Sequence, residues 1–282
     1  MPTPSPTPIG RARRDPALAL APAVSVPDTV DVLGIPLAHI DYDGTLDWID
    51  AAVARNERRY VCVAATHTVM AAREDPELRK AVLAGDLTGP DGQPLVWAMN
   101  AIGAELQDRV YGPELMARAC GRAARNGTRM FLYGGRNQGA LVQLAYNLRT
   151  LYPGLQIVGG YAPPYRALSA AEEEEIVRQI DRSRADVVWV GIGVPKQEKW
   201  MAAMRPRLQT PVLIGVGAAF DFHAGLVPQA PAWMQESGLE WLFRLAAEPR
   251  RLGRRYLRYN PRFVTGFTRQ WVGRRRALRR TP

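Results

Sequence analysis

The stretch that decides the fold is ADVVWVGIGVPKQEKW, residues 185–200. Residues 187–190 form a short, nearly continuous apolar run, which is typical of a strand buried on both faces of a parallel sheet. Gly191 and Gly193 then allow a sharp turn, and Pro195 fits the first turn of a helix, where its missing N–H is tolerated. This order of strand, glycine turn and polar helix start predicts either a ligand site at the carboxyl end of an open α/β sheet or an ordinary strand–helix turn.

The same alternation continues along the chain. Apolar runs predict strands over 60–64, 129–133, 156–158, 186–190 and 212–215. Helical spacing predicts helices over 46–58, 69–83, 93–102, 113–126, 138–151, 169–183 and 195–204. We also expect a short strand pair within 30–46 and a tight turn over 88–92. Strands that alternate with helices predict an α/β fold, a Rossmann-like parallel sheet flanked by helices with right-handed crossovers.

Composition limits the class of protein. A chain of 282 residues with 47% hydrophobic content can bury a core of one large domain or two small ones. The two cysteines, Cys62 and Cys120, lie in apolar or helical contexts and indicate buried thiols in a reducing compartment. Three histidines and no zinc-type spacing argue against a His-rich metal site. We expect no cofactor. No apolar run approaches the roughly 20 residues of a membrane span.

Three segments follow from composition. Residues 1–29 are Pro-rich and resemble a signal peptide poorly, so we expect a disordered tail. Residues 30–237 form the α/β domain, and residues 238–282 form an Arg-rich helical appendage.

Most of the positive charge lies in the appendage. The net charge is +10, and residues 241–282 hold 13 arginines and one acid, Glu248, so this segment carries +12 and the remainder −2. An apolar stripe runs along it, and Pro249 and Pro261 are expected to interrupt the helix. The stripe consists of Leu242, Leu245, Leu252, Tyr256 and Tyr259. A basic amphipathic helix favours an anionic membrane surface, and a helix packed on the main domain is the alternative.

Three glycine-rich turns follow predicted strands, at 134–135, 191–193 and 215–217. None matches a P-loop or a full dinucleotide fingerprint. A nucleotide diphosphate could still bind there, because helix N-termini favour anions, and plain turns remain the alternative. Asp91 is either a turn former or a functional carboxylate, and Thr66 and Thr68 are either helix caps or ligand hydroxyls.

Eight motifs occur in one order along the chain. They are Thr66-x-Thr68, Gly89-Pro90-Asp91-Gly92, Arg109-Val110-x-Gly112, Phe131-Leu132-x-Gly134-Gly135, Tyr152-Pro153, Gly191-x-Gly193-x-Pro195-Lys196-Gln197-Glu198-Lys199-Trp200, Gly215-Val216-Gly217-x-x-Phe220-Asp221 and Gly238-Leu239-Glu240-Trp241. Over residues 31–259 the chain resembles the WecG/TagA/CpsF glycosyltransferases. Thr68 departs from this pattern, because the family often has Asn there, and the change puts sugar choice in doubt more than reaction type.

The resemblance implies a reaction. Family members transfer a sugar from a UDP-sugar to a polyprenyl-diphosphate-linked acceptor, with inversion and without a metal, in cell-surface polysaccharide synthesis. The transferred sugar would be a hexose, N-acetylmannosamine or its uronic acid. The resemblance also implies self-association and an appendage that completes the site and contacts the membrane. It further implies a cytoplasmic protein that lies peripherally on the inner face of the plasma membrane.

The resemblance also implies roles for particular residues. Asp91 would be the general base, and Arg244, Arg251 and Arg254 would stabilise the leaving diphosphate. We assign to the substrate site Thr66, Thr68, Gly134, Gly135, Gly191, Gly193, Lys196, Gln197, Glu198, Gly217 and Asp221.

Two other functions stay open at this point. A nicotinamide- or flavin-dependent oxidoreductase could use the same sheet, although the fingerprint spacing is missing. A nucleic-acid-binding protein could use the arginines and the interleaved aromatic residues of the appendage, although the near-neutral body would be superfluous for it. We therefore expect no nucleic-acid partner.

Overall fold

The computed structural model describes residues 27–231, 233–234 and 237–278, with the side chains of Arg251 and Leu278 left out. Most of the tail predicted over residues 1–29 therefore lies outside the described residues, and Thr29 begins the first strand. The main sheet has six strands in the order β4-β3-β8-β7-β5-β6, and β1 and β2 form a separate antiparallel pair. All five pairings in the main sheet are parallel, which confirms the predicted Rossmann-like α/β class.

The strands are β1 (Thr29–Val32), β2 (Ile35–Ala38), β3 (Arg59–Ala64), β4 (Leu87–Pro90), β5 (Arg129–Gly134), β6 (Gln156–Tyr161), β7 (Val187–Gly191) and β8 (Val212–Gly215). The helices are α1 (Tyr42–Ala54), α2 (Thr66–Glu74), α3 (Pro76–Leu83), α4 (Gln93–Ala101), α5 (Gly112–Asn126), α6 (Gln138–Leu151), α7 (Ala170–Ser183), α8 (Lys196–Met204), α9 (Ala219–His223), α11 (Glu240–Ala247) and α12 (Pro249–Leu278).

Helices cover both faces of the sheet, as β7 illustrates. Val187 and Trp189 belong to one buried cluster, which also contains side chains of α1, α5 and α6. Val188 and Val190 belong to the opposite cluster, with side chains of α7 and α8. Each fully buried valine contributes roughly 1.5–3 kcal/mol, which explains why the strand reads as a continuous apolar run.

Three local predictions were wrong. The helix expected over 69–83 is divided, because the Asp75 carboxylate caps a new helix by accepting from Glu77 N and Leu78 N, both at 3.0 Å. The turn expected over 88–92 is shorter than predicted, because its first three residues belong to β4. This is an edge strand, where a terminal proline is tolerated. Helix α1 begins at Tyr42 rather than residue 46, because the Asp41 carboxylate accepts from Gly44 N at 2.8 Å.

Pro249 does separate α11 from α12, but Pro261 does not end a helix. Pro261 lies inside α12 with its side chain exposed. The carbonyl that loses its partner there belongs to Leu257, whose side chain is also exposed. Water can hydrate a free carbonyl on this face, so the helix continues.

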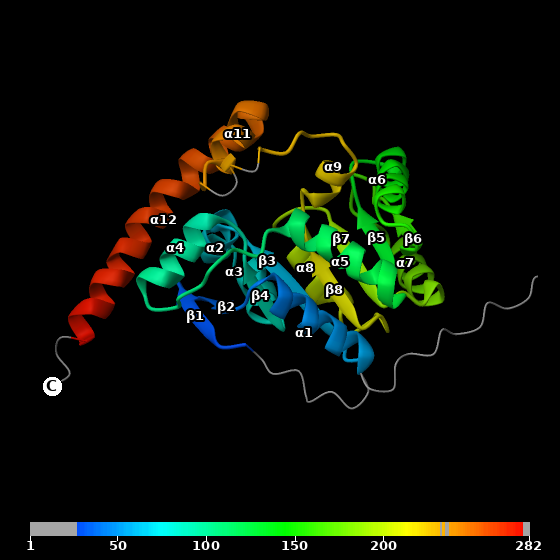
Figure 1. The fold of residues 1–282 in the computed structure, drawn as a ribbon, viewed down its shortest axis with the longest axis horizontal. Helices are drawn as coiled ribbons and strands as arrows, with labels where there is room; N and C mark the ends of the chain where they lie inside the picture. The colour runs from blue at the N-terminus through cyan, green and yellow to red at the C-terminus, as the bar shows by residue number, and fades with distance from the viewer. Residues whose placement is uncertain (1–26, 232, 235–236, 279–282) are drawn as a thin grey trace, which may run out of the picture.

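Helix α12 runs along one side of the molecule and lies against α2 (Figure 1). Its inner face buries Leu252 and Phe263, and Trp271 Nε1 donates to Ala101 O at 3.1 Å. Arg258 and Arg262 both pair with Glu74 of α2. The appendage is therefore packed on the main domain, and its contact with a membrane surface stays a prediction. Among the described helices, none is both long and apolar enough to cross a bilayer.

Candidate active site

Asp91 follows β4 at the carboxyl edge of the sheet, where all six parallel strands end. Its N–H donates to Ala64 O at 2.7 Å, and Val110 N donates to Pro90 O at 2.8 Å, so the segment before α5 lies beside Asp91. The half-buried Asp91 carboxylate accepts from Gly112 N at the start of α5. The predicted turn residue is thus a carboxylate held at a helix N-terminus.

A buried ion pair lies beside this carboxylate. Arg109 Nη1 is 2.7 Å from Glu240 Oε2, and both side chains are less than a tenth exposed. The Tyr111 hydroxyl donates to the Glu240 carboxylate, and the Arg109 guanidinium lies 4.3 Å from the centre of the Tyr111 ring. Glu240 is the first residue of α11, so the appendage contributes directly to the surroundings of Asp91.

The surroundings of Asp91 bring the pKa of its carboxyl close to neutral pH. Burial raises the pKa of its carboxyl, Arg109 and Arg244 lower it, Glu240 raises it, and the result is a pKa of about 7. A carboxylate with such a pKa can be ionised at neutral pH and still accept a proton readily. This property distinguishes Asp91 from an ordinary turn-forming aspartate.

Arg244 lies between the Asp91 cluster and helix α9, which follows the turn after β8. Its Nη1 lies 4.0 Å from Glu240 Oε1, and its guanidinium lies 5.4 Å from the centre of the Phe222 ring of α9. Its Nε is buried and has no hydrogen-bond partner in the described part of the chain. Arg254 is exposed, and the side chain of Arg251 lies outside what the structure describes. Of the three predicted arginines, the structure places Arg244 beside Asp91.

The second part of the candidate site, after the Asp91 cluster, consists of the turns after β5, β7 and β8. A Cβ at Gly134 would lie 2.5 Å from Gly191 O, and one at Gly191 would lie 2.5 Å from the Phe220 ring. These two glycines are therefore needed for close packing of the turns. Gly193 has φ +78° and open space around it, so its backbone remains accessible at this edge.

The remaining turn residues lie at the same edge. Gly135 and Gly217 also have positive φ values. Asp221, on α9, pairs with Arg136 of the turn after β5. The structure thus brings together the predicted residues of β5, β7 and β8, whose roles in binding stay predictions.

Gln197 and Glu198 lie beneath the edge. Both side chains are buried, and Gln197 Nε2 donates to Glu198 Oε1 at 2.8 Å. Burial raises the pKa of Glu198 to about 7. A Cβ at Gly217 would lie 3.4 Å from Gln197 Oε1, so this amide supports the turn after β8. Lys196, by contrast, is exposed at the start of α8.

The two threonines differ in their surroundings. Thr68 is buried, and its hydroxyl accepts from Ala65 N at 3.3 Å, so it caps α2. Thr66 is half-buried as the first residue of α2, directly after β3 and next to the β4 edge. The structure therefore leaves Thr66 as the threonine with a free surface at the edge.

Sequence reasoning did not assign Arg109, Tyr111 or Glu240 to the site. Each lies inside a motif that carried the resemblance, Arg109-Val110-x-Gly112 or Gly238-Leu239-Glu240-Trp241. The charged members of these motifs were the signal that could have found Arg109 and Glu240, whereas Tyr111 stands at the variable position of its motif and carried no signal. Within the described ranges, no cluster of three His, Cys, Asp or Glu residues is placed to bind a metal ion.

Comparison with known proteins identifies relatives. The model of the glycosyl transferase WecG/TagA/CpsF family matches residues 30–277. The chain is 28% identical over 211 residues to an N-acetylglucosaminyldiphosphoundecaprenol N-acetyl-beta-D-mannosaminyltransferase of Bacillus spizizenii, which covers 75% of this chain and 79% of the relative. These matches favour a transferase over the oxidoreductase and nucleic-acid-binding alternatives.

Proposed function

Because the chain belongs to the WecG/TagA/CpsF family of glycosyltransferases, we propose that it moves a sugar from a UDP-sugar to a polyprenyl-diphosphate-linked sugar, with inversion and without a metal. The Bacillus spizizenii relative is named as a transferase of N-acetylmannosamine to N-acetylglucosaminyldiphosphoundecaprenol. UDP-N-acetylmannosamine and that lipid-linked N-acetylglucosamine are accordingly the first pair of substrates to test.

The observation that carries the proposal is the position and environment of Asp91. In an inverting transfer, an acceptor hydroxyl oxygen attacks the anomeric carbon while the bond to the UDP oxygen breaks. The acceptor proton must pass to a base, and Asp91, with a pKa of about 7, suits that role. A single carboxylate is sufficient, because no covalent sugar intermediate forms.

The departing UDP needs positive charge. Arg244 supports this role, since its Nε is buried and lacks a hydrogen-bond partner within the described residues. The same side chain extends from α11 toward Phe222 of α9, on the side of the β5, β7 and β8 turns. We therefore place the donor over those turns, the acceptor hydroxyl at Asp91, and the diphosphate beside Arg244.

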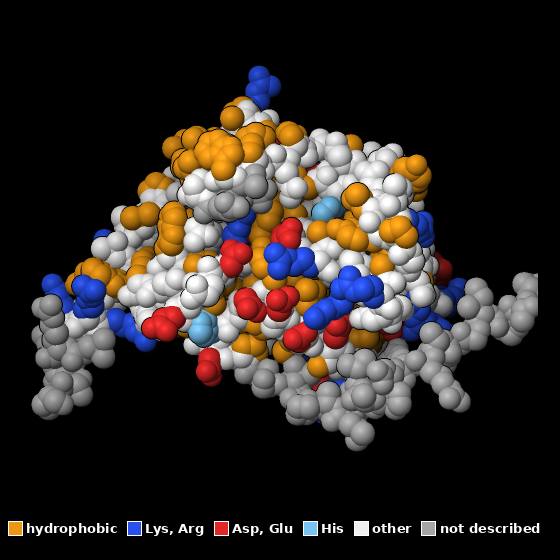
Figure 2. All heavy atoms as spheres, in the orientation of Figure 1, with side chains coloured by type: hydrophobic (Ala, Val, Ile, Leu, Met, Phe, Trp, Pro, Cys, Tyr) orange, Lys and Arg blue, Asp and Glu red, His pale blue; other side chains and the backbone are white. Residues whose placement is uncertain are grey.

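The acceptor lipid also suggests how the protein meets the membrane. Exposed apolar side chains from α4, from the segment before α11 and from α11 itself gather near Glu240, and Figure 2 shows apolar side chains over the end where α11 lies. They are Trp97, Trp233, Leu239, Trp241 and Leu242. A Cβ at Gly238 would lie 3.1 Å from the Trp97 ring, so the two parts adjoin. Exposed tryptophans beside arginines suit an anionic lipid surface.

The test is a UDP-release screen over several UDP-sugars with polyprenyl-diphosphate N-acetylglucosamine, with the lipid product identified by mass spectrometry. Asp91→Asn should lower turnover about a hundredfold or more while UDP still binds. Asp43→Asn, an exposed aspartate in the first turn of α1, is the matched control and should retain activity. Full activity of Asp91→Asn would remove Asp91 from the role of base.

A further inference from the structure

Glu240 is an acidic residue in an unusual position. It opens the Arg-rich appendage, yet its side chain is only 6% exposed and reaches into the main domain. Its carboxylate contacts Arg109 at 2.7 Å, accepts from the Tyr111 hydroxyl and lies 4.0 Å from Arg244. A buried carboxylate with three such partners is held in one place.

Arg109 lies between two carboxylates. Burial lowers the pKa of its guanidinium, but Glu240 and then Asp91 raise it, and the net direction is upward. The direct ion pair is with Glu240, and Arg109 acts on Asp91 through charge alone. The Glu240 carboxylate therefore neutralises much of the cation that would otherwise act on Asp91.

We propose that Glu240 is a positioning residue for the transfer reaction: it holds Arg109 in a buried ion pair and so keeps Asp91 a proton acceptor rather than the salt-bridge partner of Arg109. This inference rests on the proposed function, in which Asp91 is the base. It also gives the appendage a second role, because the Glu240 carboxylate of α11 acts on Arg109 and Asp91 in the main domain.

The groups that face Asp91 come from α1, from the segment that leads into α5, from the start of α5 and from α11, and together they govern its titration. Arg109, from the segment before α5, and Arg244 and Glu240, from α11, act on it by charge, and Gly112 N donates to it. The two phenols nearby, Tyr42 and Tyr111, stay neutral because burial raises both pKa values well above the ordinary one. Replacing Glu240 by a neutral residue therefore leaves two cations that both favour ionised Asp91.

The first measurement is an NMR titration of the Asp91 carboxyl in the full chain, assigned with Asp91→Asn. Glu240→Gln should lower the Asp91 pKa from about 7 by about one unit or more. The acidic limb of the kcat/KM profile should shift to lower pH by the same amount, with slower turnover at pH 8, because a weaker base accepts the proton less readily. Glu240→Asp, which keeps the charge, should restore most of the shift.

Arg109→Gln should shift the Asp91 pKa in the opposite direction. It removes a cation and should raise the Asp91 pKa, whereas Arg109→Gln with Glu240→Gln removes both charges and should return the limb close to its original position. This double variant also serves if Glu240→Gln fails to fold, since it leaves no buried unpaired charge. An unmoved titration in a folded Glu240→Gln protein, or shifts of the same sign in both single variants, would overturn the proposal.

The two proposals fail in distinguishable ways. If Asp91→Asn retains transfer, the base assignment is wrong, whatever the titration shows. If Asp91→Asn is inactive but Glu240→Gln changes only the unfolding midpoint, Asp91 remains the base and Glu240 is merely structural.

Discussion

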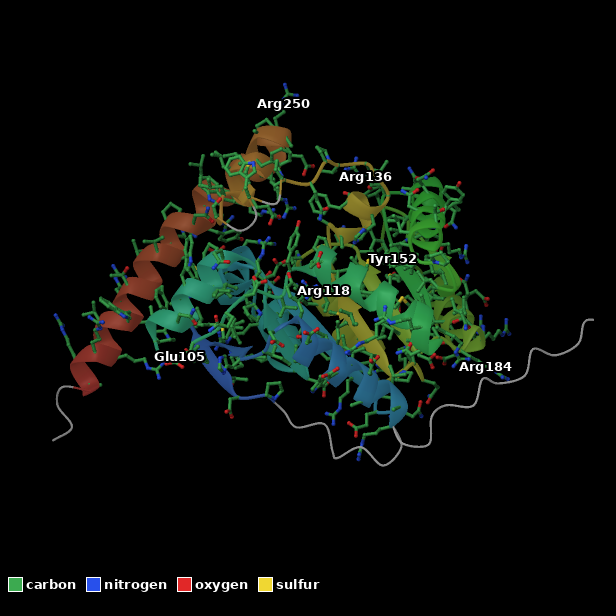
Figure 3. The ribbon with its side chains drawn as sticks, viewed as in Figure 1. Glu105, Arg118, Arg136, Tyr152, Arg184 and Arg250 are labelled. Carbon is green, nitrogen blue, oxygen red and sulfur yellow. The ribbon has the colours of Figure 1, made fainter. Side chains whose placement is uncertain are left out.

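Arg136 and Asp221 form a two-pronged ion pair that joins the turn after β5 to α9. Arg136 Nε lies 3.0 Å from Asp221 Oδ1, and Nη2 lies 3.2 Å from Oδ2. Figure 3 labels Arg136 beside α9, at the carboxyl edge of the sheet. Because Arg136 is almost half exposed, the pair contributes no more than about 1 kcal/mol to folding. We therefore expect the polar groups of a bound UDP-sugar to compete for these two side chains.

The first prediction concerns Asp221. Asp221→Asn should weaken UDP binding about tenfold, because a hydrogen bond to a charged acceptor is worth about 1.5 kcal/mol or more. Isothermal titration with UDP measures the effect. Asp47→Asn is the matched control, since Asp47 pairs with Arg122 on the exposed surface of α1 and α5. Equal UDP affinity in both variants would place Asp221 outside the donor site.

The second prediction concerns stability and pH. The folded-state pKa of Asp91 is raised from 3.8 to about 7, so folding favours the protonated carboxyl. The resulting penalty begins near pH 4, grows as pH rises to about 7 and is then constant. Asp91→Asn should therefore be more stable than the natural protein at pH 8, by an amount on the order of a few kcal/mol that shrinks toward pH 5.

Chemical denaturation at several pH values measures this effect. Glu172→Gln is a control of opposite sign, because hydrogen bonds from Arg166 and Ser169 lower the pKa of Glu172 to about 2. Glu172 therefore stabilises the fold above about pH 4.5 and loses this contribution as pH falls toward 2, so Glu172→Gln should destabilise at pH 8. A pH-independent effect of Asp91→Asn would contradict the raised pKa.

The sequence predicted the parts of the fold that local chemistry determines. The apolar run of β7 and the helix after it depend on neighbouring residues, and the structure has both. The Arg109–Glu240 pair depends instead on how the segment before α5 meets the start of α11, far along the chain, which no local pattern encodes. Asp91 could be singled out only through resemblance, because its turn signal alone is common.

The appendage likewise shows that a local sequence pattern does not identify a tertiary contact. Its apolar stripe was visible in the sequence, but a stripe indicates only that one face is covered, by lipid or by protein. The structure supplies a protein partner for part of the stripe, since Leu252 is buried and Tyr259 packs against a buried cluster that contains Phe263 of α12 and Val32 and Leu37 of the β1–β2 pair. The prediction that Pro261 ends a helix failed for a related reason, because its effect depends on whether water can reach the freed carbonyl.

The third prediction follows from this packing. Phe263→Ala should lower the free energy of unfolding by about 3–5 kcal/mol, since the side chain is almost fully buried. Val264→Ala, its exposed neighbour on the same helix, should change stability by less than about 0.5 kcal/mol. Urea denaturation compares the two. Similar small effects from both would mean that α12 is detached from the main domain in solution.

The fourth prediction tests membrane docking. Arg250 and Arg254 are exposed, and Figure 3 shows Arg250 projecting from the end where α11 and α12 meet, far from Arg184. Each cation near an anionic surface contributes about 1 kcal/mol, so the double variant Arg250→Gln, Arg254→Gln should bind phosphatidylglycerol vesicles roughly tenfold or more weakly in sedimentation. The difference should shrink in high salt, because surface charges are screened.

The matched control removes the same charge elsewhere. Arg182 and Arg184 are exposed at the end of α7, which lies at the β6 end of the sheet, at the opposite end of the molecule from α12 (Figure 1). The double variant Arg182→Gln, Arg184→Gln should bind vesicles as the natural protein does. Equal losses in both double variants would mean that total charge, rather than the face around α11, governs binding. The lipid-linked acceptor would then have to reach Asp91 without a docked orientation of the enzyme.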